Sequence, residues 1–384
     1  MRRSRLFYLW LFAGAVAGGV SYAFGQSQNL FVFRAAARGL LTGEDPYVLR
    51  AADYFKYSPT FALLFAPFAW LPAFVSAYAW SVLNFAVAYA GIACFVDDPS
   101  RRKTALVASL FGVALSTDGD QSNLLVLGLF LLGARAFERG DHAAPWLVSA
   151  GAFIKLFPAM GAAFALFRPR KGRAAVGLAC ALAAFAVLPL AVVSPSRLLA
   201  DYRSWRSLLA WDHGNQGWSA MHMAQAGLGV AWSNAAMQAC AIALQAVPIA
   251  LGARFGTDAA WRRTLACSLL SFGILFNHRA EYATYAIAAA AAGIWLSLSA
   301  PSRWKTLLVV ASMIAPGPFF ARADPSVVGA FAMIAAHRVF HPLRVVPAFF
   351  VWVWMQRDLL ARFVEVRVRW RTPRLAPHAE EQRA

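Results

Sequence analysis

The succession of apolar runs along this chain constrains its fold more than any other feature. Such runs extend from Leu6–Phe24 to Val327–Met355, and only short charged knots and two longer polar segments separate them. Sixty per cent of the residues are hydrophobic and 14% are charged, whereas a soluble domain carries about 25% charged residues. Backbone polar groups in lipid must be satisfied internally, so runs of this length predict membrane-spanning helices. The sequence therefore predicts an all-α, polytopic membrane helix bundle.

The domain organisation follows from the even spread of these runs. No soluble appendage interrupts them, so we expect a single transmembrane domain of about ten to twelve helices over residues 1–358. Residues 359–384 are rich in arginine and are predicted to form a basic cytoplasmic tail. The first run follows Met1–Arg5 directly and lacks a small-residue cleavage site, which predicts a retained first helix.

The net charge of +18 reflects how basic residues are distributed between the two sides of the membrane. Arginine and lysine gather at the N-terminus, in Arg101–Lys103, in Arg168–Arg173 and in the tail. An excess of this kind marks the cytoplasmic side of membrane proteins. We therefore expect a multi-pass protein of the inner (plasma) membrane with both termini in the cytoplasm. A nucleic-acid partner is not expected.

The cysteines predict neither a metal site nor a disulfide framework. All four lie within apolar stretches, and none has metal-ligand spacing. They are expected to be small core residues. They are Cys94, Cys180, Cys240 and Cys267.

Broken helices mark places where the chain is expected to line a cavity. The segment Tyr57–Pro72 is apolar but short and carries three prolines, which suits a re-entrant or interfacial helix. The hairpin Trp146–Phe167 breaks around Lys155–Pro158. An amphipathic stretch, Leu30–Leu41, is predicted to lie along the membrane interface. Because breaks at membrane depth are tolerated only beside a cavity or packed protein, these segments indicate a functional site.

Carboxylates are predicted to gather on the outer side, at the ends of the spans. A carboxylate-rich outer face above an apolar bundle suits chemistry between a lipid-borne group and a molecule outside. The carboxylates placed there are Glu44, Asp45, Asp53, Asp118, Asp120, Asp201, Asp212, Glu281 and Asp324.

Five motifs occur in the order in which one family of membrane enzymes carries them. They are Asn29–Phe33 with Gly43–Tyr47, Tyr54–Pro72, Asp120–Leu124 with Phe153–Pro158, Trp205–Trp218, and Phe276–Tyr282. The resemblance that they carry runs from about residue 20 to residue 350 and so covers nearly the whole chain. The sequence resembles glycosyltransferase family 87, the polyprenyl-phosphate-sugar-dependent membrane mannosyltransferases of the GT-C fold.

The resemblance implies a reaction and its substrates. Its members take a sugar, mannose or a similar one, from a polyprenyl-phospho-sugar donor and transfer it with inversion to a lipid or glycan acceptor at the outer face of the cell envelope. One carboxylate acts as general base on the acceptor hydroxyl. The leaving group is a phosphate ester, so no strong general acid is needed. The resemblance implies no cofactor, and a divalent metal is optional.

One position departs from the family pattern. The family's catalytic aspartate corresponds to Asn29, and an asparagine cannot accept a proton. If the protein is active, another carboxylate is expected to replace it: Asp45 first, Asp53 second and Glu281 third. The pair Asp45-Pro46 is also an ordinary turn initiator, so a purely structural role stays open.

The remaining candidate residues are assigned to substrate binding. Lys155 lies in an apolar stretch, where an ionisable residue is functional by default, although snorkelling or a structural ion pair stays open. His278 and Arg279 suit a phosphate or a sugar, and Asp120 is either part of the site or a helix cap. The binding candidates are Lys56, Tyr57, Asp120, Gln121, Asn123, Lys155, Arg203, Arg206, Asn215, Gln216, His278 and Arg279.

Two other functions remain open on the sequence alone. Broken helices and an intramembrane lysine also fit a transporter or a flippase-like protein, although no internal repeat is visible. Asn29 fits a catalytically inactive relative with a scaffold role. An open groove beside an outer carboxylate would favour the enzyme, a path between repeats the transporter, and a filled site the inactive relative.

Overall fold

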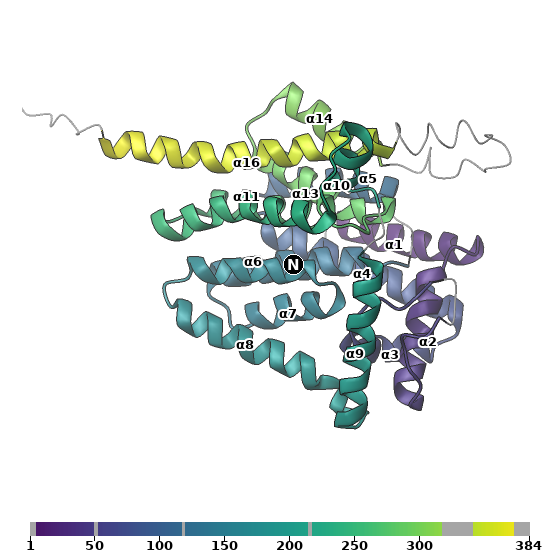
Figure 1. The fold of residues 1–384 in the computed structure, drawn as a ribbon. Helices are drawn as coiled ribbons and strands as arrows, with labels where there is room; N and C mark the ends of the chain where they lie inside the picture. Colours follow the sequence, from purple (N-terminus) through teal and green to yellow (C-terminus); the bar gives the residue numbers. More distant parts are fainter. Residues whose placement is uncertain (1–4, 50–52, 117–119, 214–216, 317–340, 372–384) are drawn as a thin grey trace, which may run out of the picture.

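The computed structural model describes residues 5–49, 53–116, 120–213, 217–316 and 341–371 (Figure 1). Throughout these ranges the regular structure is helical, and the all-α prediction is confirmed. Four helices in the described chain are long and apolar enough to cross a membrane. They are α1 (Arg5–Ala23), α4 (Ala73–Phe95), α8 (Lys171–Val187) with its extension η2 (Leu188–Ala191), and α11 (Asn234–Phe255).

Shorter apolar helices make up the broken segments. The helix α3 spans Pro59–Ala69, and its N-cap Ser58 accepts a hydrogen bond from the backbone N–H of Phe61. The helix α7 (Ala144–Ile154) ends where Lys155 adopts an extended backbone, and the 3₁₀ helix η1 (Phe157–Phe167) follows. Pro158 has no N–H to continue an α-helix across this link. The break lies where the sequence predicts it.

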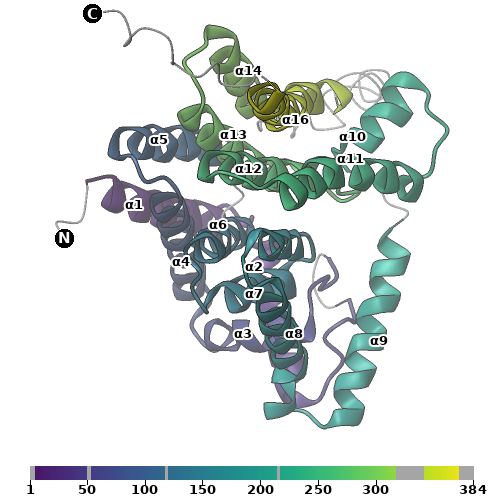
Figure 2. The same cartoon turned by 90° about the vertical axis from the view of Figure 1, so that its left-hand side faces the viewer.

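The first part of the chain packs as a stack of neighbouring helices. α1 packs on α4, α4 on α6 (Asn123–Arg139), α6 on α7, and α7 on α8 (Figure 2). A Cβ atom added to Gly128 would overlap the backbone of Val87. Small residues let membrane helices approach this closely.

The second part forms a group around α12 (Ala259–Leu275). α12 packs on α13 (Tyr285–Leu298) and on α16 (His341–Arg371), and α14 (Arg303–Ile314) packs on α16 (Figure 2). The helix α5 (Pro99–Ser116) joins the two parts, because it follows α4 in the chain and packs mainly on α13.

An aromatic cluster fixes the part of the chain between α1 and α4 against the stack. α2 (Gln28–Thr42) carries Phe33, whose ring lies 5.1 Å from that of Phe61, 5.4 Å from that of Phe65 and 6.2 Å from that of Trp80. These four side chains are buried. The cluster therefore holds α2 and α3 on α4, next to the residues that line the cavity described below.

The polar stretch that follows η2 contains a helix that was not predicted from the sequence. α9 spans Pro195–Asp212 and lies along one edge of the molecule (Figure 2). Ser194 accepts a hydrogen bond from the backbone N–H of Arg197, and Pro195 occupies the first helical position, so the start signal was present in the sequence. Short helical turns follow, α10 (Ala220–His222) and η3 (Met223–Gly227).

α11 begins at Asn234, directly after its N-cap Ser233. One boundary differs from the predicted one. α16 continues to Arg371, so the first residues assigned to a tail from 359 onward are helical.

Candidate active site

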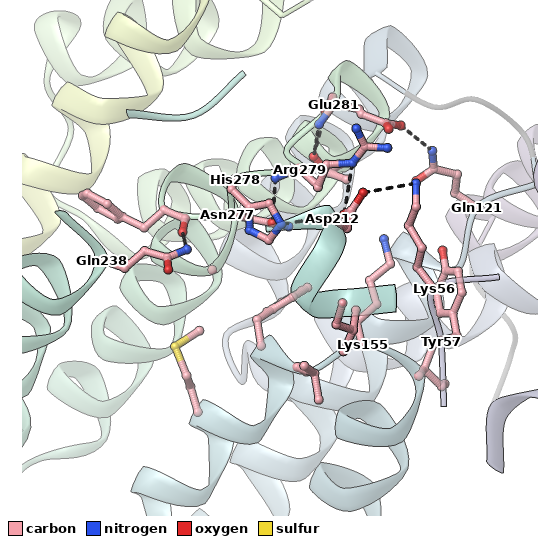
Figure 3. A pocket seen from close by; sticks show the side chains of 18 of the residues that line it. Lys56, Tyr57, Gln121, Lys155, Asp212, Gln238, Asn277, His278, Arg279 and Glu281 are labelled. Atoms are coloured by element: carbon pink, nitrogen blue, oxygen red, sulfur yellow. Dashed lines mark hydrogen bonds and ion pairs between the residues drawn. The ribbon is translucent and has the colours of Figure 1, made fainter. Parts of the chain in front are cut away.

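A cavity of about 640 Å³ opens where parts distant in the sequence meet (Figure 3). Its walls are the loop before α3, the link between α7 and η1, the C-terminal half of α9, the side of α11, and the segment between α12 and η4 (Tyr282–Thr284). The cavity has an apolar and a polar side. The apolar lining residues are Ile154, Leu156, Phe157, Met160, Leu209, Ile242, Phe272, Gly273 and Phe276.

Asp212 faces three basic side chains on the polar side of the cavity. It is the last residue of α9, and its side chain is 4% exposed. Its carboxylate lies 3.3 Å from Nε of Arg279, 3.7 Å from Nε2 of His278 and 3.8 Å from Nζ of Lys56 (Figure 3). Lys56 and His278 lie more than two hundred positions apart in the sequence, and they meet at one carboxylate at the end of α9.

Hydrogen bonds hold Lys56 at its side-chain nitrogen and at its backbone oxygen. Its Nζ donates to Oδ2 of Asp53 at 2.8 Å, and its backbone oxygen accepts from Nε1 of Trp205 at 3.1 Å. The second hydrogen bond connects the loop before α3 to α9. The position of Lys56 relative to Asp212 is therefore set by α9 itself.

Lys155 lies in the non-helical link between α7 and η1, outside the spanning helices. Its Nζ donates to Oδ1 of Asn123 at 2.6 Å and lies 5.9 Å from the centre of the Tyr57 ring. Asn123 in turn donates to the backbone oxygen of Ala283 at 2.8 Å. Burial lowers the pKa of Lys155 to about 8, and the nearby charge of Glu281 partly opposes this shift. Lys155 is therefore a cation at neutral pH that loses its proton in mildly alkaline solution.

The segment that carries His278 and Arg279 is held by backbone hydrogen bonds. Gly217 and Trp218 donate their N–H groups to the backbone oxygens of His278 and Ala280. A Cβ atom on Gly217 would overlap the backbone of Ala280, so this strand-like contact needs a glycine. Burial is the main cause of a lowered pKa of His278, to which His213 and Arg279 add and which Asp212 opposes. His278 is therefore mostly neutral at pH 7.

Glu281 presents the least engaged carboxylate of the cavity. Its side chain receives a long hydrogen bond, 3.5 Å, from Nε2 of Gln121, and the residue forms a capping box with Thr284 at the start of η4. Within the described part of the chain, no basic side chain lies within 4.0 Å of its oxygens, in contrast to Asp53 and Asp212. The residue is exposed on the polar side of the cavity.

Most of the residues predicted from the sequence come together in this cavity. Those that line it are Asn29, Asp53, Lys56, Tyr57, Gln121, Lys155, His278, Arg279 and Glu281. Asn123 lies directly behind Lys155 and fixes its ammonium group. Asp118, Asn215, Gln216 and Asp324 lie outside the described residues.

Besides Asn123, four of the predicted site residues do not line the cavity. Asp45 accepts hydrogen bonds from the backbone N–H of Tyr47 and from the hydroxyl of Ser204, as in an ordinary turn. Asp120 is buried and accepts from the hydroxyl of Ser21 at 3.4 Å. Arg203 and Arg206 are exposed on α9 and do not contribute to the lining.

Sequence reasoning gave no role to three polar lining residues, Asp212, Gln238 and Asn277. Asp212 stands at the end of α9 inside the fourth motif, Trp205–Trp218, and was placed only among the outer carboxylates. A helix assignment for 195–212 would have singled it out as the carboxylate at the end of that helix. Gln238 donates to the backbone oxygen of Phe276 at 3.0 Å and so supports the 277–281 segment.

The described residues contain no group of three or more His, Cys, Asp or Glu side chains arranged to hold a metal ion.

A comparison with protein families matches this region. The model of glycosyltransferase family 87 matches residues 55–277, more than half of the chain, and these residues include Lys56, Lys155 and Asp212. No curated protein and no solved structure matches the sequence. On the family match, this chain belongs to glycosyltransferase family 87.

Proposed function

We propose that this membrane glycosyltransferase takes its sugar from a polyprenyl-phosphate donor and transfers it, with inversion, to a hydroxyl of a lipid or glycan acceptor. We propose mannose or a similar sugar, as the family resemblance implies. The observation that carries the proposal is the two-sided cavity, in which Lys56, Lys155 and Arg279 line one side and an apolar wall forms the other.

The polar side fits a phosphate. Lys56, Lys155 and Arg279 are cations at neutral pH, and His278 adds an N–H donor. Charge-assisted hydrogen bonds to phosphate are among the strongest in proteins, and exclusion of water strengthens each of them. As the bond from sugar to phosphate breaks, the phosphodiester becomes a phosphate monoester with one more negative charge. The same cations then stabilise the leaving group in the transition state.

The apolar side fits a polyprenyl chain. Leu156 is 59% exposed and Ile242 is 58% exposed, although both line the cavity, so they mark its apolar mouth. Ile242 belongs to α11, one of the helices long enough to span the membrane. A prenyl tail entering here would bury apolar surface, which contributes roughly 25 cal/mol per Å².

Glu281 is the proposed general base. The acceptor oxygen attacks the anomeric carbon, the bond from that carbon to the phosphate oxygen breaks, and the acceptor proton passes to the Glu281 carboxylate. A base must be within reach of the acceptor and able to receive a proton. Asp53 is the second candidate, since Lys56 already engages its carboxylate at 2.8 Å. Asp45, first in the sequence ranking, does not line the cavity.

The experiment is transfer of labelled sugar by the purified protein in vesicles that contain polyprenyl-phospho-mannose and a membrane extract as acceptor. We expect labelled product and release of polyprenyl phosphate. Excess unlabelled donor should dilute the label out of the product, while release of polyprenyl phosphate continues. Binding of the donor without transfer would favour the inactive relative suggested by Asn29, which lines the same cavity. Movement of donor across the bilayer without transfer would favour a flippase.

A further inference from the structure

Three basic side chains of the cavity share one buried carboxylate, and this arrangement suggests a further role. Lys56 comes from the loop before α3, and His278 and Arg279 from the segment after α12. Asp212, at the end of α9, lies between them (Figure 3).

The contacts divide the two oxygens of Asp212 between the two walls. Oδ2 faces Nε of Arg279 at 3.3 Å and Nε2 of His278 at 3.7 Å, whereas Oδ1 faces Nζ of Lys56 at 3.8 Å. Each oxygen of Asp212 therefore faces at least one basic side chain. The distances to His278 and Lys56 exceed those of hydrogen bonds, so both groups keep donor capacity for another anion.

Electrostatics explains why such a carboxylate is needed. Lys56 and Arg279 carry like charges in a partly buried site, where Coulomb repulsion is stronger than in water. A charge left without a partner in such a place destabilises the arrangement strongly. Asp212 supplies the counter-charge before a phosphate arrives, and the hydrogen bond from Trp205 to Lys56 keeps α9 at the required distance.

We propose that Asp212 is a positioning residue, which holds Lys56, His278 and Arg279 in the geometry that receives the donor phosphate. The inference rests on the proposed function, because it assumes that a phosphate binds at this cluster. On arrival the phosphate takes up the free donor capacity of Lys56 and His278, while Arg279 stays oriented by Asp212. No proton transfer is assigned to Asp212.

The test measures binding of polyprenyl phosphate, the product that lacks a sugar, by titration calorimetry on the full-length protein in lipid nanodiscs. Asp212→Asn keeps the shape of the side chain and removes its charge, so we expect binding to weaken by about 10- to 100-fold. The donor KM should rise by a similar factor, with a smaller change in kcat. Asp212→Glu, which restores the charge, should recover part of the loss.

Asp201→Asn is the matched control. Asp201 is a buried carboxylate on the same helix, but it pairs with Arg197 one turn away and does not line the cavity. We expect this variant to bind polyprenyl phosphate within about twofold of the wild type. Melting temperatures of all variants separate lost binding from lost folding, and Asp212→Glu carries the test if Asp212→Asn does not fold.

Three results would overturn the inference. Unchanged or tighter binding by Asp212→Asn would show that Asp212 only competes with the phosphate. A fall in kcat at unchanged KM would make Asp212 the proton acceptor. An equal loss of polyprenyl phosphate binding in Asp201→Asn would show that both substitutions act by destabilising the protein. A wild-type protein that binds no polyprenyl phosphate would refute the proposed function itself, which is a distinct outcome.

Discussion

At the scale of single residues, the carboxylates of the cavity differ in what already holds them. Asp212 and Asp53 face basic groups, whereas Glu281 receives a long hydrogen bond from Gln121 and forms a capping box with Thr284, with no basic side chain within 4.0 Å in the described chain. Glu281→Gln should therefore lower kcat by about 10²- to 10⁴-fold and leave the donor KM nearly unchanged. Initial rates of transfer at varied donor concentration measure both quantities.

Asp45→Asn is the control for this prediction, and it should keep near-wild-type turnover because Asp45 serves a turn outside the cavity. If Asp45→Asn lost activity as Glu281→Gln is expected to, the base would belong to the first outer loop, as the sequence ranking had it. A large loss in Asp53→Asn at unchanged KM would instead move the role to Asp53.

Lys155 gives the cavity a predicted pH dependence. Its pKa is lowered to about 8, so the side chain is mostly charged at pH 7 and loses its proton as the pH rises through 8. Donor phosphate needs the charged form. The value of kcat/KM for the donor, which reports ionisations of the free enzyme, should therefore fall above about pH 8. Lys155→Arg should remove this alkaline fall, because arginine stays charged, even if its overall rate is lower.

Asn29→Asp tests the departure from the family pattern. Asn29 lines the cavity, so a carboxylate at this position would face the same space as Glu281. We expect activity to rise or to stay unchanged. A gain of activity when Asn29→Asp is added to Glu281→Gln would show that the two positions can exchange the role of base. A fall in activity of a folded Asn29→Asp protein would contradict the expectation.

At the scale of elements, the segment 277–281 depends on its contact with Gly217. Gly217→Ala would place a Cβ atom against the backbone of Ala280 and displace His278 and Arg279. We expect the donor KM to rise about tenfold or more while the helices stay folded. Gly172→Ala on α8, where an added Cβ meets nothing within 4 Å, is the control and should behave as the wild type.

The elements also show what could be predicted from the sequence. Apolar periodicity and prolines predicted the break after Ile154, because a proline and an ionisable residue leave a local mark. α9 was missed because its sequence, Pro195–Asp212, is polar on average and resembles a loop when only apolar runs are sought. With α9 missed, nothing in the sequence singled out Asp212, whose partners lie far away along the chain.

At the scale of the whole molecule, the distribution of charge predicts an orientation. The basic knot Arg168–Arg173 should face the cytoplasm and the cavity should face the outside. In a variant without its native cysteines, a cysteine at Arg170 should react with a membrane-impermeant maleimide only after the membrane is opened. A cysteine at Trp211, which is exposed at the end of α9, should react in intact cells. Reaction of both from the same side would contradict the orientation.

The sequence could predict which distant residues share the site, but not the contacts that they make there. Motif order suggested that Lys155, His278 and Arg279 belong to one site, and they do line one cavity. Which carboxylate contacts which cation depends on where the C-terminal end of α9 meets the segment 277–281, and no local pattern encodes that position. The ranking of Asp45 above Glu281 shows this limit, since closeness in sequence to Asn29 did not translate into a place in the cavity.

The apolar mouth formed by Leu156 and Ile242 determines which measure of donor concentration governs the rate. A donor that enters through it travels within the plane of the bilayer, and so does the spent carrier that leaves. The quantity that sets occupancy is then the mole fraction of donor among the lipids, not its amount per volume of buffer. Diluting the vesicles with water should leave the rate per protein unchanged, whereas fusing them with empty lipid should slow it.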